Sequence, residues 1–165
     1  METFYFVIKF LIYLLVASPI CMVLHELGHA SMILALTEQR VSFQMGVRGP
    51  KREFQLGRIT ILIYFEPSAL FFCRYRLENK VELSWYQDFG ITIGGPLTSL
   101  LFTIVCLILW WVSNGADPWT GLTIINFLNF LNTSIPAYYP KWQGIQGGIP
   151  TDGLQLVQLL RQSRA

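Results

Sequence analysis

The sequence predicts a mainly α-helical, polytopic membrane protein. We expect three transmembrane helices, a β-hairpin or small sheet between the first and the second, and a short C-terminal helix. Of the 165 residues, 53% are hydrophobic and only 13% are charged, and the mean hydropathy is +0.45. Soluble domains carry about 25% charged residues, so much of the usual polar surface is missing. The length predicts one domain, residues 1–165.

Three apolar runs predict the membrane spans. The first covers about residues 4–36 and exceeds the roughly 20 residues that a helix needs to cross a bilayer. Pro19 lies within this run and predicts a kink. A cleaved signal peptide is the alternative, disfavoured by the length of the run and by the lack of a clean small-residue cleavage site. The other runs, about 89–112 and 119–135, flank a turn-forming sequence at 113–118.

A β-rich segment is expected between the first two spans. Within residues 41–65, apolar and polar side chains alternate in short runs. Residues Arg48–Lys51, between the first of these runs and the next, are typical of a turn. Residues 68–88 are expected to form a polar connector. The C-terminal helix, about 152–162, is too short to cross a membrane alone.

The basic residues predict an orientation in the membrane. Eight of the twelve Lys and Arg residues lie between Arg40 and Lys80, and the 113–118 turn has none. Because cytoplasmic loops are enriched in Lys and Arg, we expect the β segment and the C-terminus to be cytoplasmic in a multi-pass integral membrane protein. The net charge of +2 is too small to indicate nucleic-acid binding. The scattered Cys21, Cys73 and Cys106 indicate reduced thiols.

The pattern His25-Glu26-Leu27-Gly28-His29 is an HExxH motif. On a helix, the i and i+4 positions bring both imidazoles to one face, where they can share a zinc ion, with Glu26 beside the metal-bound water as general base. The alternative is a set of polar residues buried in a helix bundle. Ionisable groups within an apolar helix are costly and usually mark function in membranes, which favours the metal site.

A catalytic zinc needs a third protein ligand, and the chain has no third histidine. Cys21 follows the same helical line and cannot wrap the ion together with both histidines. Glu38, Glu66 and Asp88 are carboxylate candidates, and Asp152 is the best of them because it lies at a bend that opens the last helix. The alternative for Asp152 is a helix N-cap.

The chain resembles the site-2 protease family of intramembrane zinc metallopeptidases. Those proteins carry HExxH in one transmembrane helix, then a β-hairpin region, a Gly-Pro motif opening the next helix, and an Asn-x-x-Pro…Asp-Gly motif. The matching stretches are His25–His29, the alternating segment 41–65, Gly94-Gly95-Pro96-Leu97, and Asn132…Pro136…Pro150-Thr151-Asp152-Gly153. The chain departs from the family at two places: Thr98 and Ser99 stand where the family usually has an asparagine, and Asn132 stands four residues before Pro136 instead of three.

The resemblance implies one Zn²⁺ per chain, held by His25, His29 and Asp152, with Glu26 as the catalytic base. It also implies that Asn132 binds substrate or stabilises the developing oxyanion. Asn126 and Asn129 precede Asn132 at three-residue spacing, and all three could instead hydrogen-bond between helices.

The expected function is therefore an intramembrane zinc metalloprotease, a zinc metalloendopeptidase that hydrolyses a peptide bond in or near the transmembrane segment of a membrane protein or peptide. An exposed strand of the 41–65 segment could hold an unwound substrate by strand addition, or could simply pack over the helices. Two alternatives are a metal-binding membrane subunit without protease activity, for transport or sensing, and a structural membrane subunit without metal. The expected partners are the substrate, the lipid bilayer, and a homo-oligomer or helper membrane subunit.

Overall fold

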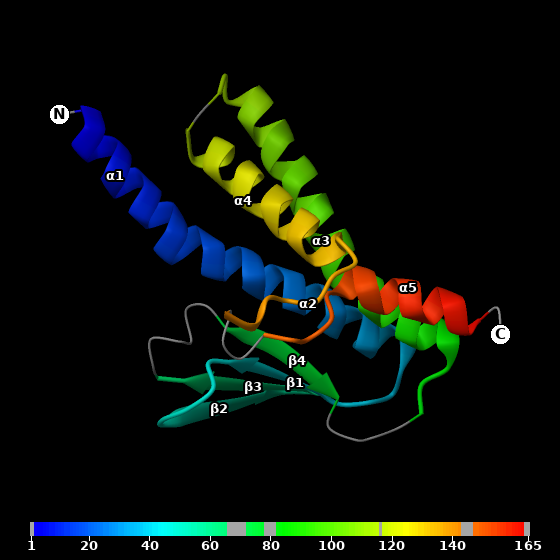
Figure 1. The fold of residues 1–165 in the computed structure, drawn as a ribbon. Coiled ribbons are helices and arrows are strands. Elements are labelled where there is room, and N and C mark those ends of the chain that lie inside the picture. The colour runs from blue at the N-terminus through cyan, green and yellow to red at the C-terminus, as the bar shows by residue number, and fades with distance from the viewer. Residues whose placement is uncertain (1, 66–71, 78–81, 116, 143–146, 164–165) are drawn as a thin grey trace.

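A computed structural model describes residues 2–65, 72–77, 82–115, 117–142 and 147–163. The N-terminal segment is one long helical rod made of α1 (Glu2–Ile12), the π-helical turn η1 (Tyr13–Ala17) and α2 (Ser18–Leu36) (Figure 1). Pro19 lies in the first turn of α2. Because proline has no N–H to donate to the preceding turn, the widened π-helical turn lies where a regular hydrogen bond is missing.

Four strands form a mixed sheet below α2 (Figure 1). They are β1 (Val41–Met45), β2 (Lys51–Leu56), β3 (Ile59–Tyr64) and β4 (Cys73–Leu77), in the order β2-β3-β1-β4. The β2–β3 hairpin is antiparallel and turns at Gly57, whose φ of 60° suits glycine. β1 pairs parallel with β3 and antiparallel with β4. The two outer strands of the sheet are thus β2 and β4.

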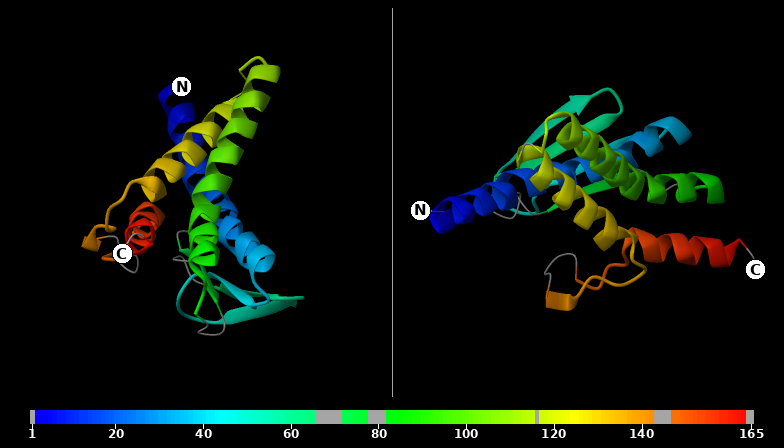
Figure 2. Two further views of the ribbon diagram at one scale, coloured as in Figure 1. Left: turned by 90° about the vertical axis from the view of Figure 1, so that its right-hand side faces the viewer. Right: turned by 90° about the horizontal axis from the view of Figure 1, so that it is seen from above.

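The remaining helices extend away from the sheet, except that the first of them begins beside the end of α2, over the sheet (Figure 2). α3 (Trp85–Val112) begins with a capping box in which Ser84 and Gln87 exchange hydrogen bonds. α4 (Asp117–Ser134) returns alongside α3, and α5 (Asp152–Gln162) lies against both. Figure 1 shows α3 and α4 rising as a pair from the end of the rod where α5 lies.

The predicted fold class, a mainly α polytopic protein with three transmembrane helices and a hairpin, is wrong. The chain forms a small α/β fold with a four-stranded mixed sheet. Among the described residues, only Val7–Leu36 and Trp85–Val112 are long and apolar enough to cross a membrane. The predicted third span, 119–135, falls in α4, which carries Asn126, Asn129 and Asn132 and is too polar to qualify.

The β segment also differs from the expectation. The tight turn joins β2 to β3 at residues 57–58, and Arg48–Lys51 does not turn β1 back onto β2. Within the expected polar connector, residues 73–77 form β4 and residues 85–88 already belong to α3; the parts at 68–71 and 78–81 lie outside the described residues. Strand β4 was missed because its partner β1 lies about thirty residues earlier in the chain.

A small apolar core joins the sheet to the helices. Ala30 and Ile33 of α2, Val41 of β1 and Ile91 of α3 are almost fully buried together. Arg58 reinforces this junction, because its guanidinium donates hydrogen bonds to the carbonyls of Leu34 and Thr37 at the end of α2. The sheet is therefore attached at the C-terminal end of α2, one to two turns beyond the histidines.

The crossing of α2 and α3 depends on two glycines in contact. A Cβ built on Gly28 would overlap the carbonyl oxygen of Gly94, and a Cβ on Gly94 would meet the carbonyl oxygen of Gly28 at 2.6 Å. Since backbone oxygens cannot swing aside, the two helices can approach this closely only because both side chains are absent.

We expect Gly94→Val to destabilise the protein by about 1–3 kcal/mol or more, because the added methyl groups force α2 and α3 apart. Chemical unfolding of the protein in mild detergent measures the change. Leu101→Phe is the matched control, since Leu101 lies on the same helix and is 53% exposed. Equal stability of the two variants would contradict the close-packing account.

Candidate metal centre

The two histidines of the HExxH motif lie one turn apart on α2 and are 5% and 1% exposed. The Nε2 atoms of His25 and His29 are 3.2 Å apart, and the ring planes meet nearly at right angles. Gly95 of α3 makes room for them: a Cβ there would overlap the Nε2 atoms of both rings. The small residue lets α3 pass directly beside the imidazole edges.

Asp152 reaches the histidines from the far end of the chain. Its Oδ2 lies 3.1 Å from His25 Nε2 and 3.5 Å from His29 Nε2. The N-cap of α5 is Thr151, whose hydroxyl accepts a hydrogen bond from the N–H of Leu154. Because Thr151 performs the capping, the Asp152 carboxylate is directed to the imidazoles and does not serve as the cap.

The approach of α5 depends on Gly153, because a Cβ there would overlap the backbone carbonyl of Ser134 at the end of α4. The hydroxyl of Thr151 also donates to the carbonyl oxygen of Ile135 at 2.7 Å. These two contacts anchor the start of α5 to the end of α4. They place Asp152 beside α2, although 127 residues separate it from His25 in sequence.

The three ligand atoms fit a tetrahedral zinc ion. Zinc bonds to imidazole nitrogen and carboxylate oxygen measure about 2.0–2.1 Å, so neighbouring ligand atoms around a tetrahedral ion lie about 3.3 Å apart. The observed separations between the His25, His29 and Asp152 atoms are 3.1, 3.2 and 3.5 Å. Three protein ligands leave one coordination position for water or substrate, as in catalytic zinc sites.

Hydrogen bonds on the other ring nitrogens suit metal binding. His29 Nδ1 lies 2.7 Å from the carbonyl oxygen of Ile91. A carbonyl only accepts, so Nδ1 carries the proton, and Nε2 is the nitrogen left to face a metal ion at the shared point. His25 Nδ1 contacts the hydroxyl of Ser99 at 3.0 Å. Both imidazoles are thus oriented from behind, in the manner of metal-binding histidines.

Ser99 extends this network to Asn129, whose side-chain N–H donates to the Ser99 hydroxyl at 3.3 Å. Ser99 is not among the predicted site residues. The available signal was its position after Gly94-Gly95-Pro96, where the site-2 proteases usually have an asparagine. Asn126 donates within its own helix to the carbonyl of Leu122. Asn132, the predicted substrate-binding residue, is exposed and lines the cavity beside the site.

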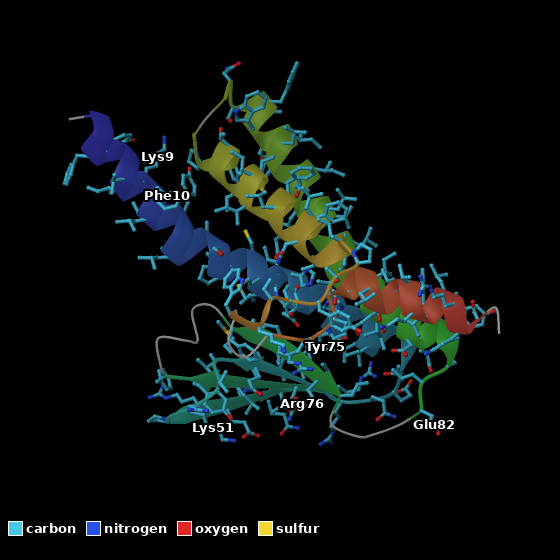
Figure 3. All side chains as sticks on the ribbon, in the orientation of Figure 1. Lys9, Phe10, Lys51, Tyr75, Arg76 and Glu82 are labelled. Atoms are coloured by element: carbon cyan, nitrogen blue, oxygen red, sulfur yellow. The ribbon has the colours of Figure 1, made fainter. Side chains whose placement is uncertain are left out.

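Glu26 faces a cavity of about 420 Å³ that also contains the His25, His29 and Asp152 side chains. Its Oε2 accepts a hydrogen bond from the backbone N–H of Tyr75 in β4 at 3.0 Å. The ring of Tyr75 stacks on the His29 imidazole, with centroids 4.6 Å apart and planes 30° from parallel. Figure 3 shows Tyr75 where β4 approaches α2.

The charge of Asp152 is favoured by its neighbours. Burial by itself raises the pKa of this carboxyl, but the hydrogen bonds with His25 and His29 outweigh burial and lower the pKa below its ordinary value. Tyr139 lines the same cavity, and its burial, together with the nearby Asp152 and Glu26, raises its pKa to about 12. The cavity thus combines an ionised carboxylate with a tyrosine that stays protonated at neutral pH.

The other carboxylate candidates do not join the histidines. The Glu38 side chain is 99% exposed and pairs with Arg58 at 3.8 Å. Asp88 lies in the first turn of α3, and Glu66 lies outside the described residues. Within the part of the chain that the structure describes, His25, His29 and Asp152 form the one group of three or more possible ligands. Cys21 is buried one turn before His25 and is not part of it.

No protein-family model matches the sequence, and a search of curated proteins finds no match either.

We expect Gly95→Ala to reduce bound zinc well below one ion per chain, because the added methyl group displaces both ligand nitrogens. Elemental analysis of the purified protein measures the metal content. Leu97→Ala changes a 38% exposed side chain nearby on the same helix and should retain zinc. A Gly95→Ala protein with full zinc content would refute the site geometry.

Ser99→Ala should weaken zinc binding about 10–100-fold, the usual effect of losing a hydrogen-bond partner of a metal-binding histidine. Competition with a chelator gives the zinc affinity. Thr103→Val is the control, because Thr103 lies one turn further along α3, is buried, and donates only to the carbonyl of Ser99. If both variants bind zinc as tightly as the wild type, Ser99 does not orient His25.

Proposed function

We propose that this chain is a zinc metalloendopeptidase that cleaves a membrane protein or peptide in or near a transmembrane segment. The observation that carries the proposal is the convergence of His25, His29 and Asp152 within 4.8 Å of one another, with Glu26 facing the same cavity. An HExxH pair with one distant carboxylate is a ligand set typical of catalytic zinc in peptidases.

Each residue then has a role in peptide hydrolysis. One zinc ion held by the three ligands would supply Lewis acidity, which polarises a peptide carbonyl and acidifies water. Glu26 accepts the proton of the attacking water and delivers it to the leaving amine as the C–N bond breaks. The hydrogen bonds to Ile91 and Ser99 hold the imidazoles in their metal-binding orientation. Asn132 remains a candidate donor to substrate from the cavity wall.

Strand β4 is the best candidate for binding an extended substrate. It is an outer strand of the sheet, and its residues 73–76 line the cavity that contains the metal centre. A peptide bond in a helix has its carbonyl hydrogen-bonded, so a cleavable segment must first unwind. Strand addition along β4 would hold it extended beside the site. The outer strand within the 41–65 segment is β2, which β1 and β3 separate from β4.

Exposed apolar surface favours a membrane location. In the most apolar stretch of the first candidate span only 18% of the residues are buried, and in that of the second span 44% of the residues are buried. A buried core helix of a soluble protein would be covered by its own fold, whereas these helices leave most of their apolar side chains uncovered. The exposed side chains on α3 include Leu101, Ile104, Val105, Leu107, Ile108, Trp111 and Val112.

The sheet is assigned to the cytoplasmic side. The C-terminus is assigned to the same side, because α4 returns alongside α3 and brings α5 back toward the sheet end of the helices. Basic residues concentrate in the sheet region, between Arg40 and Lys80, and the turn after α3 has none. Lipid and the membrane-embedded substrate are then the partners at the apolar faces, while the polar cavity admits water. A homo-oligomer or a helper membrane subunit could cover part of the exposed apolar surface.

We expect Glu26→Gln to lower the cleavage rate at least about 100-fold while zinc remains bound, because general acid–base catalysis contributes about 10²–10⁴-fold and Glu26 is not a ligand. Asp152→Asn should lose zinc and cleavage together. A fluorogenic transmembrane peptide in detergent micelles measures cleavage, and elemental analysis measures zinc.

Full biological function in the Glu26→Gln protein would favour the alternative of a metal-binding subunit for transport or sensing. Substoichiometric zinc in the wild type would favour a structural subunit without metal. Either result would contradict the peptidase proposal.

A further inference from the structure

The contact between Glu26 and Tyr75 has a consequence for substrate binding. In an antiparallel pair, alternate residues direct their N–H and C=O groups toward the partner strand or away from it. The N–H of Tyr75 points away from β1, because it donates to the Glu26 carboxylate at 3.0 Å. It belongs to the outer edge of β4, which is the last strand in the sheet order.

The same N–H is the group that an added substrate strand would use. Strand addition joins the outward N–H and C=O groups of an edge strand to the backbone of the incoming peptide. At Tyr75 that donor is already occupied by the side chain of Glu26. A peptide carbonyl and the Glu26 carboxylate would therefore compete for one backbone hydrogen.

We propose that the Tyr75 N–H is a positioning group that couples substrate binding to the catalytic base. In the free protein it holds Glu26 against β4. When an extended substrate pairs with β4, its carbonyl takes over the N–H and the Glu26 carboxylate is released toward the metal centre. The base becomes available only when a peptide is in place. This inference rests on the proposed function.

The Tyr75 ring keeps the residue in place while its backbone N–H changes its hydrogen-bond acceptor. Because the ring is stacked on His29 at 4.6 Å, the residue stays against α2 while its N–H changes partner. Glu26 follows His25 directly on α2, so a side-chain rotation moves its carboxylate without moving the ligands. The handover therefore requires no displacement of either backbone.

The competition is tested by binding, in zinc-loaded full-length protein in mild detergent. The probe is a blocked peptide of alternating valine and threonine, with dissociation constants measured by stopped-flow fluorescence before turnover. We expect Glu26→Ala to bind the peptide about tenfold tighter than the wild type, since one hydrogen bond to a charged group is worth at least that much. Glu26→Gln should lie between them, because its neutral amide oxygen is a weaker acceptor. Equal affinities in all three would overturn the proposal.

Two substitutions of Tyr75 separate its N–H from its ring. Tyr75→Ala removes the ring and retains the N–H, so peptide affinity should still depend on residue 26. Tyr75→Pro removes both, and its affinity should be weaker and independent of residue 26. Proline is tolerated where an edge-strand N–H points outward. A tenfold effect of Glu26→Ala that persists in the Tyr75→Pro background would overturn the proposal.

Amide hydrogen exchange at Tyr75 gives a readout in the native residue, should Tyr75→Pro fail to fold. The amide should be protected in the wild type, exchange faster in Glu26→Ala, and become protected again when peptide is added. If the Tyr75 amide of Glu26→Ala still exchanges fast when peptide is bound, the proposed change of hydrogen-bond acceptor is refuted. Neither measurement requires cleavage, so a wild type that binds peptide but never hydrolyses it would sink the peptidase proposal alone.

Discussion

The approach of the Asp152 carboxylate to two paired imidazoles is the constraint on which the rest of this structure depends. Three polar groups meet within hydrogen-bonding distance between apolar helices, and each would be costly there without the others. Glycines permit the meeting: Gly28 against Gly94 brings α3 onto α2, Gly95 clears the ring edges, and Gly153 lets α5 abut α4. A methyl group at any of these positions would separate elements that carry or support the site.

The sheet and the helices meet the site from opposite sides. Helix α3 supplies the acceptor for His29 and the hydroxyl for His25, while strand β4 supplies the N–H for Glu26 and a ring against His29. The proposed metal ligands are thus oriented mainly by the helices, and the proposed base by the sheet. Under the proposed function, this division would let a peptide bound to the sheet affect Glu26 without disturbing His25, His29 and Asp152.

Local pattern was sufficient for part of the fold and insufficient for the rest. The long first helix, the second helix (predicted at about 89–112 and observed at Trp85–Val112) and the terminal helix follow from local apolar runs. The sheet topology does not, because the parallel pairing of β1 with β3 and the pairing of β1 with β4 join segments that local alternation cannot match. The third predicted span was wrong because the prediction relied on the length of the segment and on its apolar residues. The three asparagines of α4 make it too polar to qualify as a span.

By itself, the sequence determined that His25 and His29 share a helix face with Glu26 beside them, since i and i+4 spacing is a local property of the α-helix. It also singled out Asp152 as a carboxylate at a helix start. Only the tertiary structure decided that this carboxylate reaches the imidazoles, that Thr151 is the cap, that Ser99 and Ile91 orient the rings, and that Tyr75 holds Glu26. Except for the Thr151 cap, which is local, those contacts join residues 49 to 127 positions apart in the sequence. They are set by long-range packing, which the periodicity of a single sequence does not encode.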